Sequence, residues 1–202
     1  MLVRGAVEEE TNCTGGISVI KINWNNVTTE GVKHLLKLPT KLINKLESLD
    51  LYANDLNSES CATLAHLIQH MPHLKELNLS INYNIGLGGA IPLIRSLTAL
   101  NSLENLNLYG TAIGVEDFRA LSELLSSSTS LKYLNVGGND LPAEGVELVI
   151  SGLCRNTTLK SLLMSDSHFS PQNTISLASV LKTNHTLVTL GLQRCHIDLP
   201  DL

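Results

Sequence analysis

The chain has 202 residues, of which 43% are apolar and 16% are charged, and its formal net charge is −5. This composition excludes a disordered charged tail, which needs low hydrophobicity, and argues against a nucleic-acid-binding protein, which usually carries a basic excess. No apolar run approaches the roughly 18 residues of a membrane helix. We therefore expect a cytoplasmic protein with neither a nucleic-acid nor a membrane partner.

An internal repeat dominates the sequence. The pattern L-x-x-L-x-L-x-x-N-x-L, with Ile or Val allowed for Leu, recurs at intervals of 28 or 29 residues. Its starting positions are Ile17, Leu46, Leu74, Leu103, Leu131, Leu159 and Leu187. Chance leucine spacing would not keep this phase along the chain, so the pattern indicates stacked structural units rather than a single motif.

Each unit is predicted to be a strand followed by a helix. In x-x-L-x-L-x-x the apolar residues alternate with variable ones, which is typical of a half-buried strand. The polar position after the strand can bond backbone groups of neighbouring turns, and it is occupied by Asn25, Asn54 and Asn139. Smaller groups replace it in three other repeats, where we expect a weaker ladder: Thr111, Ser167 and Cys195.

The first two repeats carry clusters of cationic or metal-ligating residues. In repeat one, four lysines lie four residues apart and would form a basic stripe if the segment were helical: Lys33, Lys37, Lys41 and Lys45. Such a charge run is usually a solvated face. In repeat two, His66 and His70 are one helical turn apart, with His73 nearby. Because the H-E-x-x-H form is absent, we expect an exposed helix face and no metal site.

Repeat three departs from the pattern, whereas repeats four and five follow it closely. The step from Leu79 to Ile85 is one residue longer than elsewhere, which predicts a bulge at 82–84 with Asn82 or Asn84 at the ladder position. The glycines of the segment 86–89 are expected to loosen the chain beyond the bulge. In repeats four and five, helical faces are formed by Phe118, Leu121, Leu124 and Leu125, and by Val146, Val149, Ile150 and Leu153.

The two ends of the array differ from its middle. Residues 1–16 do not form a full repeat, and the repeat domain is expected over 17–202. The last repeat is interpreted as truncated, because the chain stops at Leu202, after the seventh strand and before its helix. A repeat array needs polar caps at its open ends. The sequence is therefore interpreted as part of a longer array.

These repeats resemble the leucine-rich repeat family, and specifically its ribonuclease-inhibitor-like class. The turn-and-strand runs at 156–159 and 184–190 are similar to the repeats of nucleotide-oligomerisation-domain-like receptors. The resemblance implies an α/β fold: a right-handed leucine-rich-repeat solenoid of seven strand units, with parallel strands on the concave face and helices on the convex face.

The aromatic residues have an uneven distribution. Both Phe residues, Phe118 and Phe169, take core positions, whereas every Tyr and the single Trp fall at variable strand positions or in the adjoining loop. These five are Trp24, Tyr52, Tyr83, Tyr109 and Tyr133. Exposed Tyr and Trp are frequent interface anchors. We predict a protein-binding site on the concave face, surrounded by mixed charge from Asp166, Arg194, Lys21, Asp50 and Glu76.

No constellation of residues predicts catalysis, a metal or a cofactor. Cys195 lies at the ladder position, where a buried thiol is inert, and His168 and His196 are equivalent positions without an evident carboxylate partner. The chain is thus predicted to be a non-enzymatic protein-binding module, the sensing or scaffolding region of a cytosolic receptor-like protein. The resemblance leaves two alternatives open: a Ran-type GTPase activator, for which Arg194 is the only strand–loop Arg, and an enzyme-occluding inhibitor. The oligomeric state is not indicated.

Overall fold

The computed structural model describes residues 16–198. Its main sheet has seven parallel strands in the order β1-β2-β3-β4-β5-β6-β8. The strands are β1 (Val19–Lys21), β2 (Ser48–Asp50), β3 (Glu76–Asn78), β4 (Asn105–Asn107), β5 (Tyr133–Asn135), β6 (Ser161–Leu163) and β8 (Thr189–Gly191). The helices are α1 (Thr29–Leu35), α2 (Thr40–Ile43), α3 (Ser58–Ile68), α4 (Ile91–Leu97), α5 (Val115–Ser127), α6 (Ala143–Arg155) and α7 (Pro171–Thr183).

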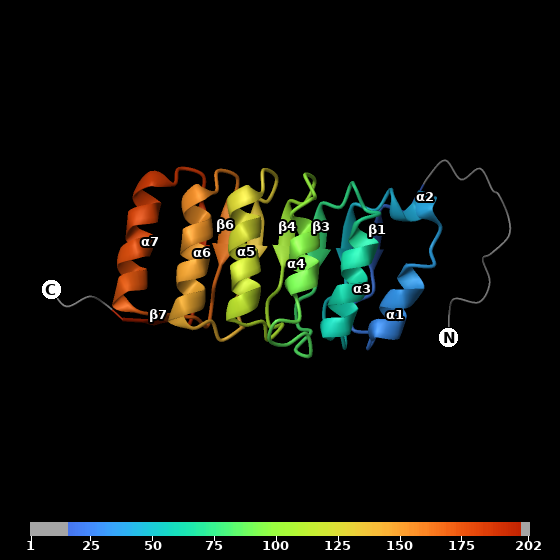
Figure 1. The fold of residues 1–202 in the computed structure, drawn as a ribbon, viewed down its shortest axis with the longest axis horizontal. Coiled ribbons are helices and arrows are strands. Elements are labelled where there is room, and N and C mark those ends of the chain that lie inside the picture. The colour runs from blue at the N-terminus through green and yellow to red at the C-terminus, as the bar shows by residue number, and fades with distance from the viewer. Residues whose placement is uncertain (1–15, 199–202) are drawn as a thin grey trace.

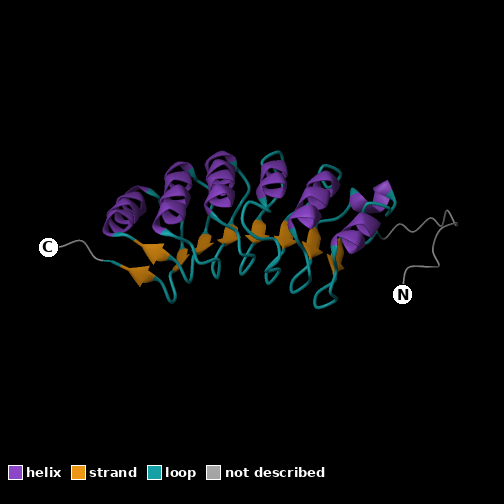
Figure 2. Cartoon of the chain, turned by 60° about the horizontal axis from the view of Figure 1, so that its bottom comes forward, coloured by secondary structure: helices purple, strands orange, loops and turns teal. Residues whose placement is uncertain are grey.

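The molecule is a two-layered arc. Strands line one side and helices the other, with the helices on the outside of the curve (Figure 2). As the chain advances from right to left in Figure 1, the helices in front rise and the strands behind descend, which is a right-handed coil. The predicted α/β leucine-rich-repeat solenoid with seven parallel strand units is confirmed.

The core is a continuous stack of leucines between the two layers. The central strand residues align across the sheet, so that Leu77, Leu106, Leu134 and Leu162 are neighbours and are all buried. The predicted apolar faces of α5 and α6 pack against this row, and Phe118 is fully buried. Because each turn shields only its neighbours, the repeats are expected to stabilise one another pairwise.

The asparagine ladder links successive turns. In Asn54, Asn82 and Asn139 the side-chain amide donates to a backbone carbonyl of its own repeat and to one of the preceding repeat. The side-chain oxygen accepts from backbone N–H groups of the preceding repeat, such as Leu56 N–H at 3.1 Å from Asn82. Each of these side chains therefore satisfies polar groups that the bend leaves unpaired.

Two of the three smaller ladder residues lack the link to the preceding repeat, as predicted, whereas Cys195 bonds the Met164 carbonyl of that repeat at 3.1 Å. The hydroxyls of Thr111 and Ser167 bond carbonyls of their own repeats, Leu108 at 2.8 Å and Met164 at 2.7 Å. Within the described residues neither hydroxyl reaches a carbonyl of the preceding repeat. The prediction that Asn25 is a ladder residue is wrong. Its amide donates to the Asn23 carbonyl and is exposed, because β1 is the edge strand of the described sheet.

Repeat three contains the predicted irregularity, and Asn82 holds the ladder position. Asn84 instead donates to the Asp55 carboxylate at 2.6 Å. The loop continues to Ala90, so α4 has seven residues where α5 has thirteen. Asp117, which is fully buried, accepts from Gly88 N–H at 2.7 Å and Ala90 N–H at 3.0 Å. The loop is thus anchored to the next repeat and is not loosely held.

The lysines of repeat one do not form a single helical stripe. Helix α1 ends at Leu35, and α2 begins only at Thr40, after Pro39. Lys33 lies 2.7 Å from Glu30 and 3.1 Å from Glu59, so its charge is already paired. No helix within residues 16–198 has the length and apolarity needed to span a membrane.

A second, two-stranded parallel sheet was not predicted. It pairs β7 (His168–Phe169) with β9 (His196–Ile197), one repeat apart at the loop edge. The predicted N-terminal segment 1–16 falls outside the described residues except for Gly16, and residues 199–202 fall outside them as well.

Repeat seven is expected to open before the central repeats. The amides of Thr189 and Tyr133 make equivalent 2.9 Å bonds to Lys160 and Glu104 carbonyls, but Leu187, Leu190 and Leu192 are only partly buried. Thin apolar cover lowers the cost of local opening. Hydrogen exchange measured by NMR should therefore be faster at Thr189 than at Tyr133. Equal protection of the two amides would show that the end repeat is as well covered as the middle.

Candidate protein-binding site

Tyr52 and Tyr109 occupy the same position in repeats two and four. Tyr52 lies three residues after Leu49, and Tyr109 lies three residues after Leu106, the leucines that are aligned at the centres of their strands. Each tyrosine directly follows a buried leucine and is itself half-buried. Ser80 takes the place between them in repeat three. Two strand spacings separate the tyrosines by roughly 10 Å, so both can contact one partner.

The aromatic side chains are held by their neighbours. The Trp24 and Tyr52 rings meet edge to face, with centroids 5.4 Å apart, although Trp24 is 72% exposed. The Tyr109 ring covers Gly138, where an added Cβ would lie 2.9 Å from it and where φ is +67°. Because these rings are already positioned, binding would cost less conformational entropy than ordering free side chains.

Tyr133 lies at the other end of the strands. It is the first residue of β5, whereas the residue of the same repeat that is equivalent to Tyr109 is Gly137. The two positions are four residues apart, which is roughly 13 Å along a strand. Tyr133 helps to line a shallow hollow of about 350 Å³ on the concave face, together with the predicted charged residues Lys21, Asp50 and Glu76. The concave face thus has aromatic groups at both strand ends and polar groups between them.

A row of asparagines on the concave face was not recognised in the sequence, and two of its members, Asn78 and Asn107, line this hollow. Asn78, Asn107 and Asn135 are aligned in β3, β4 and β5, and each side-chain oxygen accepts from the backbone N–H two residues later at 3.1 Å. Their Nδ2 groups make no hydrogen bond to any described residue. Three amide groups on successive strands are therefore available as hydrogen-bond donors. The available signal was that Asn recurs between the two apolar residues of the x-x-L-x-L-x-x pattern in repeats three, four and five.

Asp166 and Arg194 form a bidentate ion pair. Arg194 Nε lies 2.6 Å from one Asp166 oxygen, and Nη2 lies 2.7 Å from the other. The guanidinium lowers the pKa of the Asp166 carboxyl. The pKa of Arg194 is raised by Asp166 first and then by the nearby Tyr109 hydroxyl. Tyr109, in the middle repeat of the array, therefore lies near these two charged residues, which belong to repeats six and seven at the end opposite Trp24.

Tyr83 belongs to a different surface from the other aromatic residues. It lies in the loop after the ladder residue Asn82, is 62% exposed, and lies against Gly110. Together with Leu87 it lines a hollow on the loop edge and not on the strand face. The five aromatic residues therefore divide between the concave face and the loop edge.

The described part of the chain contains three thiols, of which Cys154 is exposed and Cys61 is buried. Burial raises the pKa of the Cys61 thiol to about 12, which disfavours the nucleophilic thiolate. Cys195 is half-buried and its sulfur donates to the Met164 carbonyl at 3.1 Å. No group of three or more His, Cys, Asp or Glu residues within 16–198 is arranged to hold a metal ion.

His168 and His196 lie together, as their equivalent positions suggested. Their rings stack with centroids 4.9 Å apart. The expectation that they lack a carboxylate partner is wrong, because Asp140, one repeat earlier, lies 2.9 Å from His168 Nε2. The parallel stacking of the rings suits packing rather than shared coordination of an ion.

The comparisons with known proteins agree with this architecture. A family model described as Leucine Rich repeat matches residues 70–93 and 127–149. These two matches cover part of the chain and agree with its fold, which is a leucine-rich-repeat solenoid. Among solved structures, the chain is similar to Leiomodin-1 Actin-Binding Site 2, with 20% identity and a TM-score of 0.60 over 70% of this chain and 80% of that one. No curated protein matches the sequence. The likeness at this identity concerns the fold.

Proposed function

We propose that the chain is a non-enzymatic module that binds a protein partner on its concave face. The observation that carries the proposal is a set of pre-positioned aromatic residues on a polar strand face: Trp24 lies against Tyr52 in the first two repeats, and Tyr109 lies beside the Asp166–Arg194 ion pair. Tyr and Trp combine a large apolar area with a polar group, which suits them to interfaces.

The dimensions of the face fit a protein rather than a small molecule. Seven strands at about 4.8 Å give a ladder on the order of 30 Å long, which accommodates a standard interface of about 800 Å² per partner. The outward amides of Asn78, Asn107 and Asn135 supply hydrogen-bond donors in the centre of that area. A partner would complement this face if it placed hydrogen-bond acceptors at the asparagine amides and apolar groups against the aromatic residues on either side.

We further propose that this module is the sensing or scaffolding region of a cytosolic receptor-like protein. The support is the similarity of the runs at 156–159 and 184–190 to receptor repeats, in which Asn156 and Asn184 bond carbonyls of the preceding turn. The test is to identify the full-length transcript and determine whether a nucleotide-binding module adjoins the repeats. A transcript that encodes the repeats alone would contradict the receptor role.

No structural observation favours the two alternative functions. An Arg finger must reach the partner's nucleotide, whereas Arg194 is held in a bidentate pair by Asp166. A GTP hydrolysis assay with small GTPases tests the activator role directly. Inhibition of a captured partner enzyme would test the occluding role.

Changing Tyr52 or Tyr109 to alanine is expected to weaken partner binding by at least about 1 kcal/mol, close to fivefold, because each change removes a pre-positioned anchor. Partners would be captured with the whole chain from cell extract, with purified actin as a separate probe because the similar leiomodin-1 structure bears an actin-binding name. Affinities would then be measured by calorimetry. Glu123→Ala, on the exposed face of α5, is the control. If the control abolishes binding and the tyrosine variants do not, the partner uses the convex face.

A further inference from the structure

The loop edge of the solenoid contains a second hollow, separate from the concave face. It has a volume of about 710 Å³ and is lined by loops and helix starts of repeats three to five. These loops lie below α4 and α5 in Figure 1. Its walls are mainly apolar and include Tyr83, Leu87, Val115 and Pro142. A cavity of this size accepts one or two large side chains.

The irregular loop of repeat three creates this hollow. Gly86 and Gly88 adopt φ values of +69° and +72°, and between them Leu87 projects with 84% of its surface exposed. The loop is nevertheless fixed, because the buried Asp117 carboxylate accepts N–H groups from Gly88, Ala90 and Gly114. A large apolar side chain is therefore held in water by a rigid support, which is costly unless a partner covers it.

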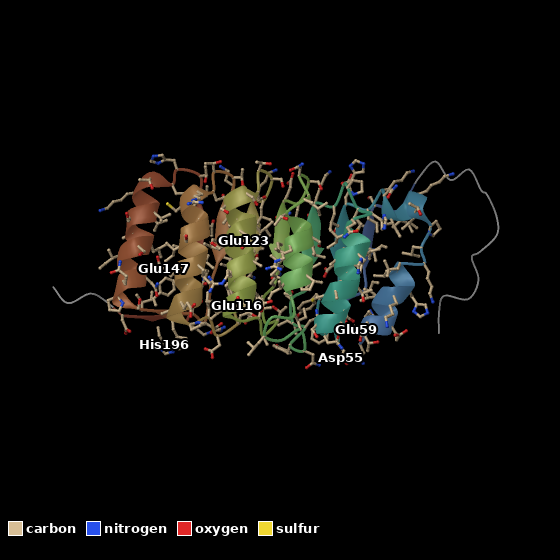
Figure 3. The ribbon with its side chains drawn as sticks, viewed as in Figure 1. Asp55, Glu59, Glu116, Glu123, Glu147 and His196 are labelled. Atoms are coloured by element: carbon tan, nitrogen blue, oxygen red, sulfur yellow. The ribbon has the colours of Figure 1, made fainter. Side chains whose placement is uncertain are left out.

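The rim of the hollow is acidic. Glu116 and Asp140 are lining residues, and Glu144 lies beside them. Arg119 is shared between Glu116 at 3.4 Å and Glu144 at 3.7 Å, and His168 contacts Asp140 at 2.9 Å. Three carboxylates thus face one permanent positive charge. The same edge continues with Asp55 and Glu59, which Figure 3 places in line with Glu116.

We propose that this hollow is a docking site for a protein segment that inserts a bulky apolar side chain and places a Lys or Arg beside Glu116 and Asp140. The apolar side chain would cover Leu87 and Tyr83, and the cation would complete the pairing of the rim carboxylates. Phosphate-rich partners are disfavoured, since the rim repels nucleic acid and anionic lipid alike. The site extends beyond the concave-face function and uses none of its strand residues.

A displayed library of random linear peptides tests the proposal. The library would be selected on the whole chain and depleted on the Leu87→Asp variant, and enriched peptides would be titrated by fluorescence anisotropy. Enriched peptides are expected to combine a bulky apolar residue with a nearby Lys or Arg. Their affinity should fall about tenfold or more with Leu87→Asp, because the change puts a charge where the apolar side chain would be buried.

Matched variants separate the site from general surface effects. Leu181→Asp changes another exposed leucine, on α7, and Glu123→Gln changes another exposed carboxylate of α5, away from the rim. Both should bind like the unmodified chain, whereas Glu116→Gln should weaken binding several-fold, with a smaller effect at high salt. If Leu87→Asp alters thermal melting, Tyr83→Ser provides the second test of the apolar wall.

Three outcomes would overturn the proposal. The enriched peptides could bind the Leu87 variant as well as the original chain, they could be acidic, or no peptide could be enriched over the depleted background. Each of these would show that the hollow does not take an apolar segment with a basic residue.

Discussion

Replacing Leu106 by alanine is expected to lower the free energy of unfolding by about 2–5 kcal/mol, because it opens a cavity in the middle of the core. Leu106 is fully buried at the centre of β4, between Leu77 and Leu134 of the adjacent strands. In a repeat array each repeat is stabilised mainly by its two neighbours. The loss of stability therefore falls on the contacts that repeat four makes with repeat three and with repeat five. Unfolding should consequently lose cooperativity.

The single tryptophan makes this loss of cooperativity measurable. Trp24 reports repeat one by fluorescence, whereas circular dichroism reports the helices of repeats one to six. In urea the two transitions should coincide for the unmodified chain and separate for Leu106→Ala. Leu87→Ala removes the same atoms from an exposed position and should melt like the unmodified chain. A midpoint near the original for Leu106→Ala would contradict the strand register of the sheet.

The strand register was predictable from the sequence because the repeat length fixes it. One strand per 28 or 29 residues places Leu49, Leu77 and Leu106 side by side, and the sheet pairs them as the period requires. The alternation of buried and variable positions then decides which residues face the core. The equivalence of Tyr52 and Tyr109, and the proximity of His168 and His196, follow from the same period.

Features that depend on contacts between particular neighbouring turns were not predictable. Asn25 matches the ladder pattern, but a ladder residue needs a preceding turn to bond, and β1 is the edge strand of the described sheet. The asparagine row in β3, β4 and β5 was missed because its positions vary in other repeats. Tyr83 lies on the loop edge and Tyr109 on the concave face because of the path of one irregular loop, that of repeat three.

The hollow on the loop edge illustrates the same limit. The extra residue in repeat three and the glycines after it predicted a bulge, and Asn82 was one of the two residues expected at the ladder position. The anchoring of that loop by Asp117 required a buried carboxylate from the next repeat, which single-repeat patterns do not reveal. Local irregularity was therefore visible in the sequence, whereas the surface that it creates was not.

Two asparagines of repeat five should differ sharply in their contribution to stability. Asn139 is buried and bonds the Leu108 and Val136 carbonyls, each at 2.8 Å, and the Thr111 N–H at 2.9 Å. Because alanine leaves these buried groups unpaired at about 1–3 kcal/mol each, Asn139→Ala should cost at least about 2 kcal/mol. Asn135→Ala removes one 3.1 Å bond from a half-exposed side chain and should cost less than about 1 kcal/mol.

A third variant, Asn139→Thr, tests whether the loss of stability depends on the number of hydrogen bonds removed. Asn139→Thr should fall between the other two, because a hydroxyl at the ladder position bonds a carbonyl of its own repeat, as Thr111 does with Leu108. Urea unfolding gives the three free energies, and hydrogen exchange at Thr111 should rise most in Asn139→Ala, where its N–H loses its acceptor. Similar costs for Asn139→Ala and Asn135→Ala would mean that stacking of leucines alone joins the repeats. The expected order instead makes the buried asparagine the polar link between adjacent turns, and places the outward-facing one on the concave surface proposed to bind a partner.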